Sequence, residues 1–405
     1  MRGPPTRSAM SRGGRAVALL VVTLVAVGTV AAYALWPGDD RAGRGGVQAS
    51  LAVSAALGSG DLSGFARATA PRPFSFPADS GPHPEFRTEW WYYTGNLETA
   101  AGRHFGFQLT FFRTALAPPA ARATDRSAPS PSAWSARQLY LAHFALTDTA
   151  GRRFHAWSRL DREALGLAGA QASPFRVWLE DWSAESDAPG GLPVRLRAAE
   201  GDVAIDLVLA SEKPVALQGD RGLSRKGPEP GNASYYYSLS RMTARGTVRA
   251  GGEALAVSGL AWMDREWSTS ALGPELVGWD WVALQLDDGR DVMLYRLRRR
   301  DGTADAHSAG TLIATDGATR PLAASDLTLE ALDHWTSPRS RVRYPSRWRL
   351  VIPGAGLDLQ ITPRLADQEL IVGTRYWEGA VGVVGAAHGR PIAGRGYVEL
   401  VGYGE

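Results

Sequence analysis

From Phe74 almost to the C-terminus, the chain consists of short segments in which apolar and polar residues alternate, separated by Gly, Asp and Asn. The segment HFGFQLTFFR (104–113) places Phe105, Phe107, Leu109 and Phe111 on one face, and LYLAHFALTD (139–148) and VAIDLVLA (203–210) alternate in the same way. A period of two residues is typical of β-strands that bury one face. Because helical patterns are few, the sequence predicts a mostly β protein built as barrels or sandwiches.

Two segments of the chain resemble each other. EWWYYTGNLETAAGRHFGFQL (89–109) and GWDWVALQLDDGRDVMLYRL (278–297) both run from an aromatic strand through a Gly-Arg turn into an apolar strand. With 405 residues, the chain is too long for one small core. We therefore expect two similar antiparallel barrels in tandem, over residues 72–255 and 256–405, after a linker at 39–71 rich in Gly, Ala and Ser.

Residues 1–38 are typical of an export segment. Four arginines precede the apolar run AVALLVVTLVAVGTVAAYALW (16–36), which contains no charge and is long enough to cross a bilayer. Ala32-Tyr33-Ala34 offers a cleavage site of the A-x-A kind. The segment can serve as a cleaved signal peptide or as a retained anchor, and we expect the protein in the periplasm or on the outer face of the cytoplasmic membrane.

Charge and cysteine content exclude several classes of protein. The net charge is +3, and removing the four N-terminal arginines leaves −1, while the remaining arginines are scattered instead of forming a stripe. Nucleic acid is therefore not an expected partner. The chain has no cysteine, so disulfides and a thioether lipid anchor are excluded. The seven histidines are not closely paired, and we expect neither a metal site nor a cofactor.

Aromatic residues supply the first set of candidate ligand contacts. In TEWWYYTGNL (88–97), strand alternation turns Trp90 and Tyr92 to one face and Trp91 and Tyr93 to the other. Glu89 beside them is either an anchor for these rings or a group at a pocket mouth. Fourteen tryptophans favour apolar cavities or interfaces. The predicted pocket-wall residues are Trp90, Trp91, Tyr92, Trp279 and Trp281.

The densest polar stretch within apolar surroundings is GLAWMDREWSTSALGPELVGWDW (259–281). Alternation sends Asp264 and Glu266 to one face and Arg265 and Trp267 to the other, so a charge enters an apolar environment on either side. In one interpretation a carboxylate pairs with Arg265 or a distant arginine and holds a strand in place. In the other, a carboxylate with a raised pKa in a Trp-lined pocket transfers a proton.

Two further positions have the same ambiguity. His143 lies in the middle of an apolar strand, where it is either a satisfied core or interface residue or a ligand contact. Tyr236, within Tyr235-Tyr236-Tyr237, either fills the core or lines a pocket.

Several of these stretches together resemble the AttH/carotenoid 1,2-hydratase (CrtC-like) family, in particular its exported members often labelled predicted secreted hydrolases. The stretches are TEWWYYTGNL, LYLAHFALTD, YYYSLSRMTARGTV, GLAWMDREW and GWDWVALQLDDGRDVMLYRLRRRDG, and the resemblance runs from about Phe74 to Tyr403. It implies two tandem lipocalin-like barrels, a fold that holds one apolar ligand.

The resemblance also implies a site. Carotenoid hydratases use a His and a Trp in D-H-x-W and a Tyr and an Asp in Y-x-D. The first motif here reads Asp264-Arg265-Glu266-Trp267, and the second aligns with Tyr295-Arg296-Leu297. Because the His is replaced by Arg265 and the proton-donating Asp by Leu297, we do not expect carotenoid hydration itself.

The sequence thus leaves three functions open: a binding protein for a lipid-like or other apolar small molecule, an enzyme of the hydratase, isomerase or hydrolase kind, and a subunit of an envelope transporter complex. The candidate catalytic residues are Asp264, Glu266, Trp267 and Tyr295. The candidate ligand-binding residues are Trp90, Trp91, Tyr92, His143, Tyr236, Arg265, Trp279 and Trp281.

Overall fold

The computed structural model describes residues 62–119, 137–269, 272–273 and 275–404. Within these ranges the chain is almost entirely strand, with three single-turn 3₁₀ helices at Ala78–Ser80, Ala324–Asp326 and Pro353–Ala355. In this part of the chain no helix has the length and apolar character needed to cross a membrane. The predicted export segment, 1–38, and most of the predicted linker, 39–71, lie outside the described residues.

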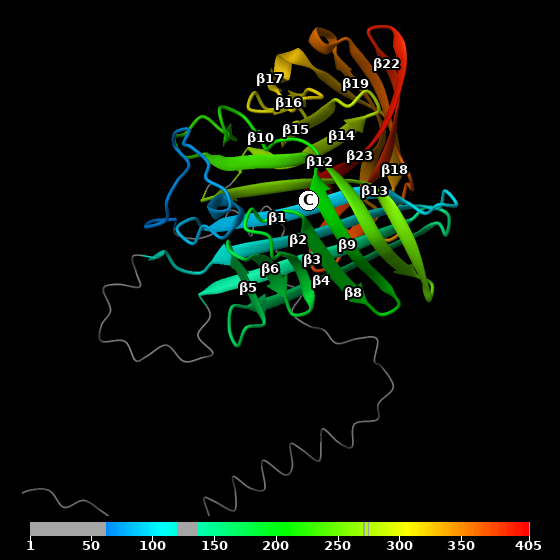
Figure 1. Ribbon diagram of the computed structural model, residues 1–405. Coiled ribbons are helices and arrows are strands. Elements are labelled where there is room, and N and C mark those ends of the chain that lie inside the picture. The colour runs from blue at the N-terminus through cyan, green and yellow to red at the C-terminus, as the bar shows by residue number, and fades with distance from the viewer. Residues whose placement is uncertain (1–61, 120–136, 270–271, 274, 405) are drawn as a thin grey trace, which may run out of the picture. The chain divides into compact units, whose positions relative to one another are not determined.

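The first sheet contains thirteen antiparallel strands, in the order β4-β3-β2-β1-β13-β12-β9-β8-β7-β6-β5, with β10 and β11 paired to β12 (Figure 1). Its strands are β1 (Thr88–Glu98), β2 (His104–Ala115), β3 (Gln138–Asp148), β4 (Arg153–Arg162), β5 (Ala168–Gln171), β6 (Phe175–Leu179), β7 (Trp182–Ser186), β8 (Val194–Glu200), β9 (Val203–Ser211), β10 (Ala216–Leu217), β11 (Leu223–Arg225), β12 (Ala233–Ala250) and β13 (Glu253–Ser268).

The second sheet contains ten strands, in the order β17-β16-β15-β14-β23-β22-β20-β19-β18, with β21 paired to β22. Its strands are β14 (Leu276–Leu286), β15 (Asp291–Arg299), β16 (Ala309–Ile313), β17 (Thr319–Ala323), β18 (Thr328–Thr336), β19 (Arg343–Ile352), β20 (Leu357–Pro363), β21 (Glu369–Ile371), β22 (Arg375–Ala387) and β23 (Arg390–Val401).

The first sheet curls into a nearly closed barrel, because β2, β3 and β4 come into contact with β6. Its interior is filled by the alternating apolar residues that the sequence pattern indicated, among them Phe105, Phe107, Leu109 and Phe111 of β2. The second sheet forms a half-barrel over its own apolar core, which includes Trp348 and Trp377. The prediction of a mostly β fold with tandem lipocalin-like barrels is confirmed.

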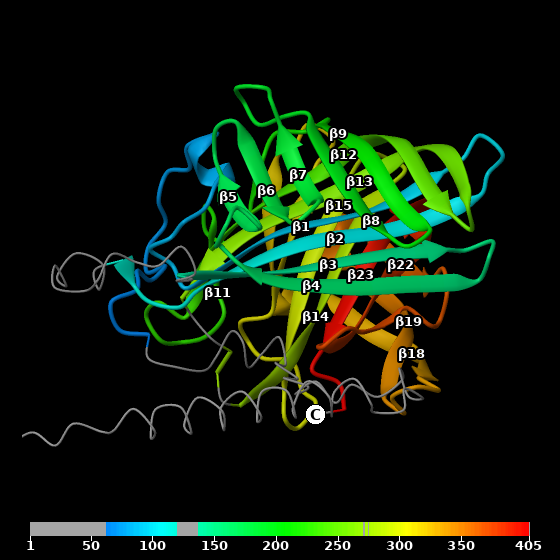
Figure 2. The same ribbon diagram turned by 90° about the horizontal axis from the view of Figure 1, so that it is seen from below.

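The two sheets pack against each other and are not separated by a linker. Figure 2 shows β1, β2 and β3 crossing β14, β22 and β23 at a steep angle, and contacts join β1 to β23 and β2 to β22. At this crossing a Cβ on Gly106 would lie only 2.5 Å from the Cβ of Ala380, so glycine permits the close approach. The carboxylate of Asp291, in the second sheet, also forms ion pairs with Lys213, which follows β9, and with Arg241 of β12, each with an N···O distance of 2.7 Å.

The chain changes sheet between Ser268, the end of β13, and Leu276, the start of β14. The predicted domain boundary at 255/256 falls within β13, which pairs with β12 and β1 of the first sheet. The described residues belong to one compact unit, so the division into two domains stays a prediction.

A buried ionic cluster closes off the apolar interior of the first barrel. Glu89 is fully buried, and its carboxylate accepts hydrogen bonds from Arg113, from Arg265 and from the backbone N–H of His83. Burial alone would raise the pKa of Glu89, but the charges of Arg113 and Arg265 and the bond with His83 outweigh it and hold that pKa well below its usual range. Glu89 is therefore an ionised anchor for two buried arginines.

Replacing Glu89 with Gln should lower the free energy of unfolding by about 3–5 kcal/mol, because two buried guanidinium groups lose their counter-charge. Urea unfolding at pH 7 measures the change. Glu253→Gln is the control: Glu253 is 64% exposed and lies 3.7 Å from Arg103, so its loss should cost under about 0.5 kcal/mol. Equal effects of the two substitutions would contradict the assignment of Glu89 as an anchor.

Candidate functional site

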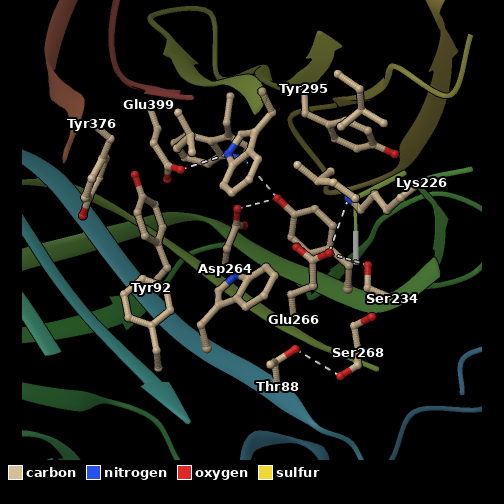
Figure 3. A pocket seen from close by; sticks show the side chains of 18 of the residues that line it. Thr88, Tyr92, Lys226, Ser234, Asp264, Glu266, Ser268, Tyr295, Tyr376 and Glu399 are labelled. Atoms are coloured by element: carbon tan, nitrogen blue, oxygen red, sulfur yellow. Dashed lines mark hydrogen bonds and ion pairs between the residues drawn. The ribbon is translucent and has the colours of Figure 1, made fainter. Parts of the chain in front are cut away.

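A pocket of about 130 Å³ lies between the two sheets, outside the interior of the first barrel, and is partly open to solvent (Figure 3). Its lining residues are Thr88, Trp90, Tyr92, Phe112, Lys226, Ser234, Tyr236, Asp264, Glu266, Ser268, Leu272, Trp279, Trp281, Tyr295, Leu297, Tyr376, Glu378, Glu399 and Val401.

Strand alternation explains why these side chains meet. On the first sheet, Tyr92 of β1 pairs with Asp264 of β13, and Trp90 pairs with Glu266, so all four point to the same face. On the second sheet, Trp281 of β14 is paired with Glu399 of β23. Each sheet thus contributes alternate residues of its central strands, and the two sets face each other across the pocket.

Asp264 is the most strongly coordinated carboxyl group in the pocket. It accepts hydrogen bonds from Ser238 Oγ at 2.5 Å, from Trp262 Nε1 at 2.7 Å and from the hydroxyl of Tyr236. Burial raises the pKa of Asp264 to about 7, the charge of Glu266 adds to the rise, and the three hydrogen bonds oppose it. Near neutral pH, Asp264 is therefore present both as an acid and as a base.

Glu266, two residues along the strand, has an ionic partner. Its carboxylate accepts a hydrogen bond from Ser234 and lies 3.4 Å from the ammonium nitrogen of Lys226. The same ammonium group sits over the ring of Tyr295 at 3.8 Å. Burial is the largest single influence on the pKa of Lys226 and lowers it, but the charge of Glu266 and its other neighbours together outweigh burial, so that this pKa is raised. These contacts form an ion pair at one end of the pocket.

Two more carboxyl groups come from the second sheet. Glu378 of β22 and Glu399 of β23 are cross-strand neighbours. Glu399 accepts a hydrogen bond from Trp279 Nε1 at 2.9 Å, whereas the fully buried Glu378 has the hydroxyls of Tyr92 and Tyr376 as neighbouring donors but no well-formed hydrogen bond. Burial raises the pKa of both groups well above its usual range, and Glu399 adds to the rise at Glu378. We expect this pair to hold at least one proton at neutral pH.

Two tyrosines connect the sheets across the pocket. The hydroxyl of Tyr236, which donates to Asp264, accepts a hydrogen bond from Trp281 Nε1 at 3.1 Å. The hydroxyl of Tyr295 lies 3.0 Å from Ser224 Oγ and donates a hydrogen bond to the carbonyl oxygen of Arg225 at 3.3 Å. Hydrogen bonds that run from Trp281 of β14 through Tyr236 therefore hold Asp264 in place.

The structure brings together eight of the residues predicted from the sequence. The residues that line the pocket are Trp90, Tyr92, Tyr236, Asp264, Glu266, Trp279, Trp281 and Tyr295. Leu297, which stands where the hydratase motif has its Asp, also lines the pocket and leaves that position without an acid.

Four predicted residues lie elsewhere. Trp91, Arg265 and Trp267 point into the first barrel, where the Arg265 guanidinium lies 3.9 Å from the Trp91 ring centre and Trp267 stacks on His83 at 3.8 Å. These three predicted residues are on the opposite strand face from Asp264 and Glu266, so they belong to the core around Glu89. His143 lies behind the pocket, with Nδ1 2.7 Å from the hydroxyl of Tyr376.

Sequence reasoning missed Glu378, Glu399 and Lys226. Glu378 and Glu399 each interrupt an apolar strand, in RYWEGAV (375–381) and GYVEL (396–400), which is the signal that drew attention to Glu89. Nothing in the sequence places them opposite Asp264, because that juxtaposition depends on how the two sheets cross. Lys226 follows the short strand β11 and had no local pattern to mark it.

The arrangement combines aromatic walls with four carboxyl groups and one ammonium group. Such a pocket can exclude water from an apolar molecule and exchange protons with it at neutral pH. Among the described residues, no group of three or more His, Asp or Glu side chains is placed to hold a metal ion.

Comparison with protein families gives a match over most of the chain. The model of the AttH-like family matches residues 67–403. No curated protein matches the chain.

Solved structures similar to the chain include the following two. The AttH structure from Nitrosomonas europaea is 36% identical, with a TM-score of 0.73, over 84% of this chain and 100% of that one. Kievitone hydratase from Nectria haematococca is 18% identical, with a TM-score of 0.63, over 86% of this chain and 98% of that one. At that identity the second likeness shows a shared fold alone.

The raised pKa of Asp264 predicts how the stability of the fold depends on pH. The native state binds a proton that the unfolded chain releases between about pH 4 and pH 7, so the stabilisation is complete at acidic pH and is lost as the pH rises through 7. Glu378 and Glu399 act in the same direction. The free energy of unfolding should fall by about 2 kcal/mol or more from pH 5 to pH 8.

Urea unfolding across this range tests the dependence, with Asp264→Asn expected to flatten the profile and to be more stable than the wild type at pH 8. Asp202→Asn, at an exposed turn, is the matched control and should leave the profile unchanged. A pH profile of Asp264→Asn that has the same shape as that of the wild type would contradict the raised pKa of Asp264.

Proposed function

This chain belongs to the AttH-like family, and we propose that it binds an apolar or amphipathic small molecule in the pocket between its sheets and transfers a proton to or from it. The reaction class is that of a hydratase or isomerase acting on an unsaturated substrate. Asp264 is the acid–base group, and Trp90, Tyr92 and Trp281 form the walls that hold the substrate.

One observation carries the proposal: a carboxyl group with a pKa of about 7 opens onto an aromatic-lined pocket. A catalytic acid or base works best when its pKa is near the operating pH, because both protonation states are then populated. A protein that only carried an apolar ligand would gain nothing from burying Asp264, which lowers the stability of the fold at neutral pH. The buried acid therefore favours an enzyme over a carrier.

The proposed steps balance in atoms and charge. Neutral Asp264 gives its proton to one carbon of a C=C bond, and the positive charge that develops on the other carbon faces the aromatic rings of the wall. In hydration, a water molecule then adds to that carbon and returns a proton to the Asp264 carboxylate. In isomerisation, the carboxylate instead removes a proton from a neighbouring carbon. Tyr236 and Ser238 hold the carboxyl group in place throughout.

A hydrolase with a serine nucleophile receives less support from this pocket. Among the described residues that line it there is no histidine, and the hydroxyl of Ser234 is committed to the Glu266 carboxylate. A serine nucleophile requires a neighbouring base that takes its proton and is itself held in place. A carboxylate already paired with Lys226 is a poor base.

The acid–base role can be tested with 5-nitrobenzisoxazole, a small apolar probe. A carboxylate removes the proton from its C3 carbon while the N–O bond breaks, which releases a coloured cyanonitrophenolate. The rate should rise with pH to a plateau with a midpoint near 7, following ionisation of Asp264. Asp264→Asn should lower kcat by roughly a hundredfold or more.

Trp281→Ala should raise KM for the same probe more than it lowers kcat, because the ring contacts the bound molecule and not the proton. Glu330→Gln, at an exposed position of β18, is the control and should match the wild type. An Asp264→Asn variant that keeps the wild-type kcat and midpoint would overturn the assignment of Asp264.

We also propose that the protein acts outside the cytoplasm, in the cell envelope, on the basis of the arginines and apolar run of residues 1–38. No observation on the described residues favours a role in an envelope transporter complex.

Export can be measured by fractionating bacteria that produce the full chain with a C-terminal tag. The tagged protein should be found in the periplasm, or in the membrane fraction and degraded by protease added to spheroplasts. A variant without residues 1–38 is the control and should stay in the cytoplasm. Recovery of both forms in the cytoplasm would contradict export.

A further inference from the structure

The two carboxyl groups of Glu378 and Glu399, at one end of the pocket, have few well-formed hydrogen bonds and no ion pair among the described residues. The two residues are cross-strand neighbours on β22 and β23, and both line the pocket. Glu378 is fully buried, and the neighbouring groups that act on it as donors are the neutral hydroxyls of Tyr92 and Tyr376, neither of which makes a well-formed hydrogen bond to its oxygens. Glu399 accepts a single bond, from Trp279. Buried carboxyl oxygens without donors are rare and costly in folded proteins.

The other carboxyl groups of the pocket do not share this deficit. Asp264 receives three hydrogen bonds, and Glu266 has Ser234 and the ammonium group of Lys226. Lys226 is also the single cationic side chain among the described lining residues. Once it is assigned to Glu266, no positive charge remains for the pair on the second sheet.

We propose that Glu378 and Glu399 bind the protonated amine of an otherwise apolar ligand. An ammonium group has three donors and no acceptor, so it supplies what the two carboxyl groups lack. The aromatic rings beside the pair favour the same charge: Tyr92 lies edge-to-face with Trp281 at 5.1 Å, and aromatic faces attract cations. This inference names the substrate class of the proposed active site and rests on that function.

The described groups around the pair of Glu378 and Glu399 are either neutral or negatively charged. Tyr92 on β1, Tyr376 on β22 and Tyr397 on β23 all have pKa values raised by burial and are neutral. His143 on β3, behind Tyr376, is also neutral, because burial lowers its pKa to about 3. Asp264 and Glu266 on β13 add negative charge. No cation among the described neighbours opposes an ammonium group here.

The same surroundings predict that binding releases protons. In the empty pocket, burial keeps protons on Glu378 and Glu399. An ammonium group placed between them stabilises the ionised carboxylates and lowers their pKa values. At neutral pH a bound amine should therefore displace a proton into the buffer.

Isothermal titration calorimetry of the full chain with three probes of similar size tests the proposal: 2-phenylethylamine, 2-phenylethanol and 3-phenylpropanoate. At pH 7.5 the amine should bind roughly ten to a hundred times more tightly than the alcohol, and the anion more weakly than either. Titrations in phosphate and in Tris, whose ionisation enthalpies differ, should show net proton release for the amine and none for the alcohol.

The double variant Glu378→Gln, Glu399→Gln should bind the alcohol as the wild type does, lose the preference for the amine and lose the proton release. Glu330→Gln is the control and should retain both. Because the double variant removes two buried acids that no cation neutralises, its thermal unfolding temperature should not fall, and the single Glu378→Gln variant provides the same test with a smaller change.

The outcomes separate this inference from the function beneath it. Equal affinity for amine and alcohol, or an amine preference that survives in the double variant, would overturn the amine site and leave the Asp264 chemistry standing. Binding of none of the three probes would overturn the amine site together with the pocket as a ligand site. A loss of 5-nitrobenzisoxazole turnover in Asp264→Asn, with no amine preference in the wild type, would support the enzyme alone.

Discussion

Where the two sheets cross, the second half of β13, from Ala261 to Ser268, has no face in water, and the rest of the structure depends on this constraint. β13 turns one set of side chains into the first barrel and the alternate set toward the second sheet. The charged residues in this part of the strand, Asp264, Arg265 and Glu266, are therefore all buried, whichever way they point. Burying an ionised group costs several kcal/mol unless another charge or a proton neutralises it. The two faces of β13 meet this cost in different ways.

On the barrel face, charge is neutralised by charge. Arg265 and Arg113 enclose Glu89, and the aromatic rings of Trp91 and Trp267 pack around the cluster. On the pocket face, neutralisation is largely by protons, because Asp264, Glu378 and Glu399 outnumber the available cations. Fixed ion pairs are suited to holding a fold together, whereas groups that hold exchangeable protons near neutral pH are suited to chemistry.

Much of the fold could be predicted, because alternation within a strand is a local property. The strand pattern indicated tandem barrels, and it separated Trp90 and Tyr92 from their neighbours on TEWWYYTGNL. It also placed Asp264 and Glu266 on one face of β13. What alternation could not decide was which face meets a pocket, so Trp91, Arg265 and Trp267 were included with the site although they lie in the barrel core. Glu378 and Glu399 were missed because their position opposite Asp264 depends on the packing of two sheets far apart in sequence.

The central claim is that Asp264 exchanges a proton near neutral pH while it faces the pocket. Carbon-13 NMR of protein labelled at the aspartate carboxyl carbons measures this directly, with Asp264→Asn used to assign the signal. The account predicts a single titration with a midpoint near 7. A carboxyl signal from Asp264 that titrates at or below its ordinary value of about 4 would contradict the account.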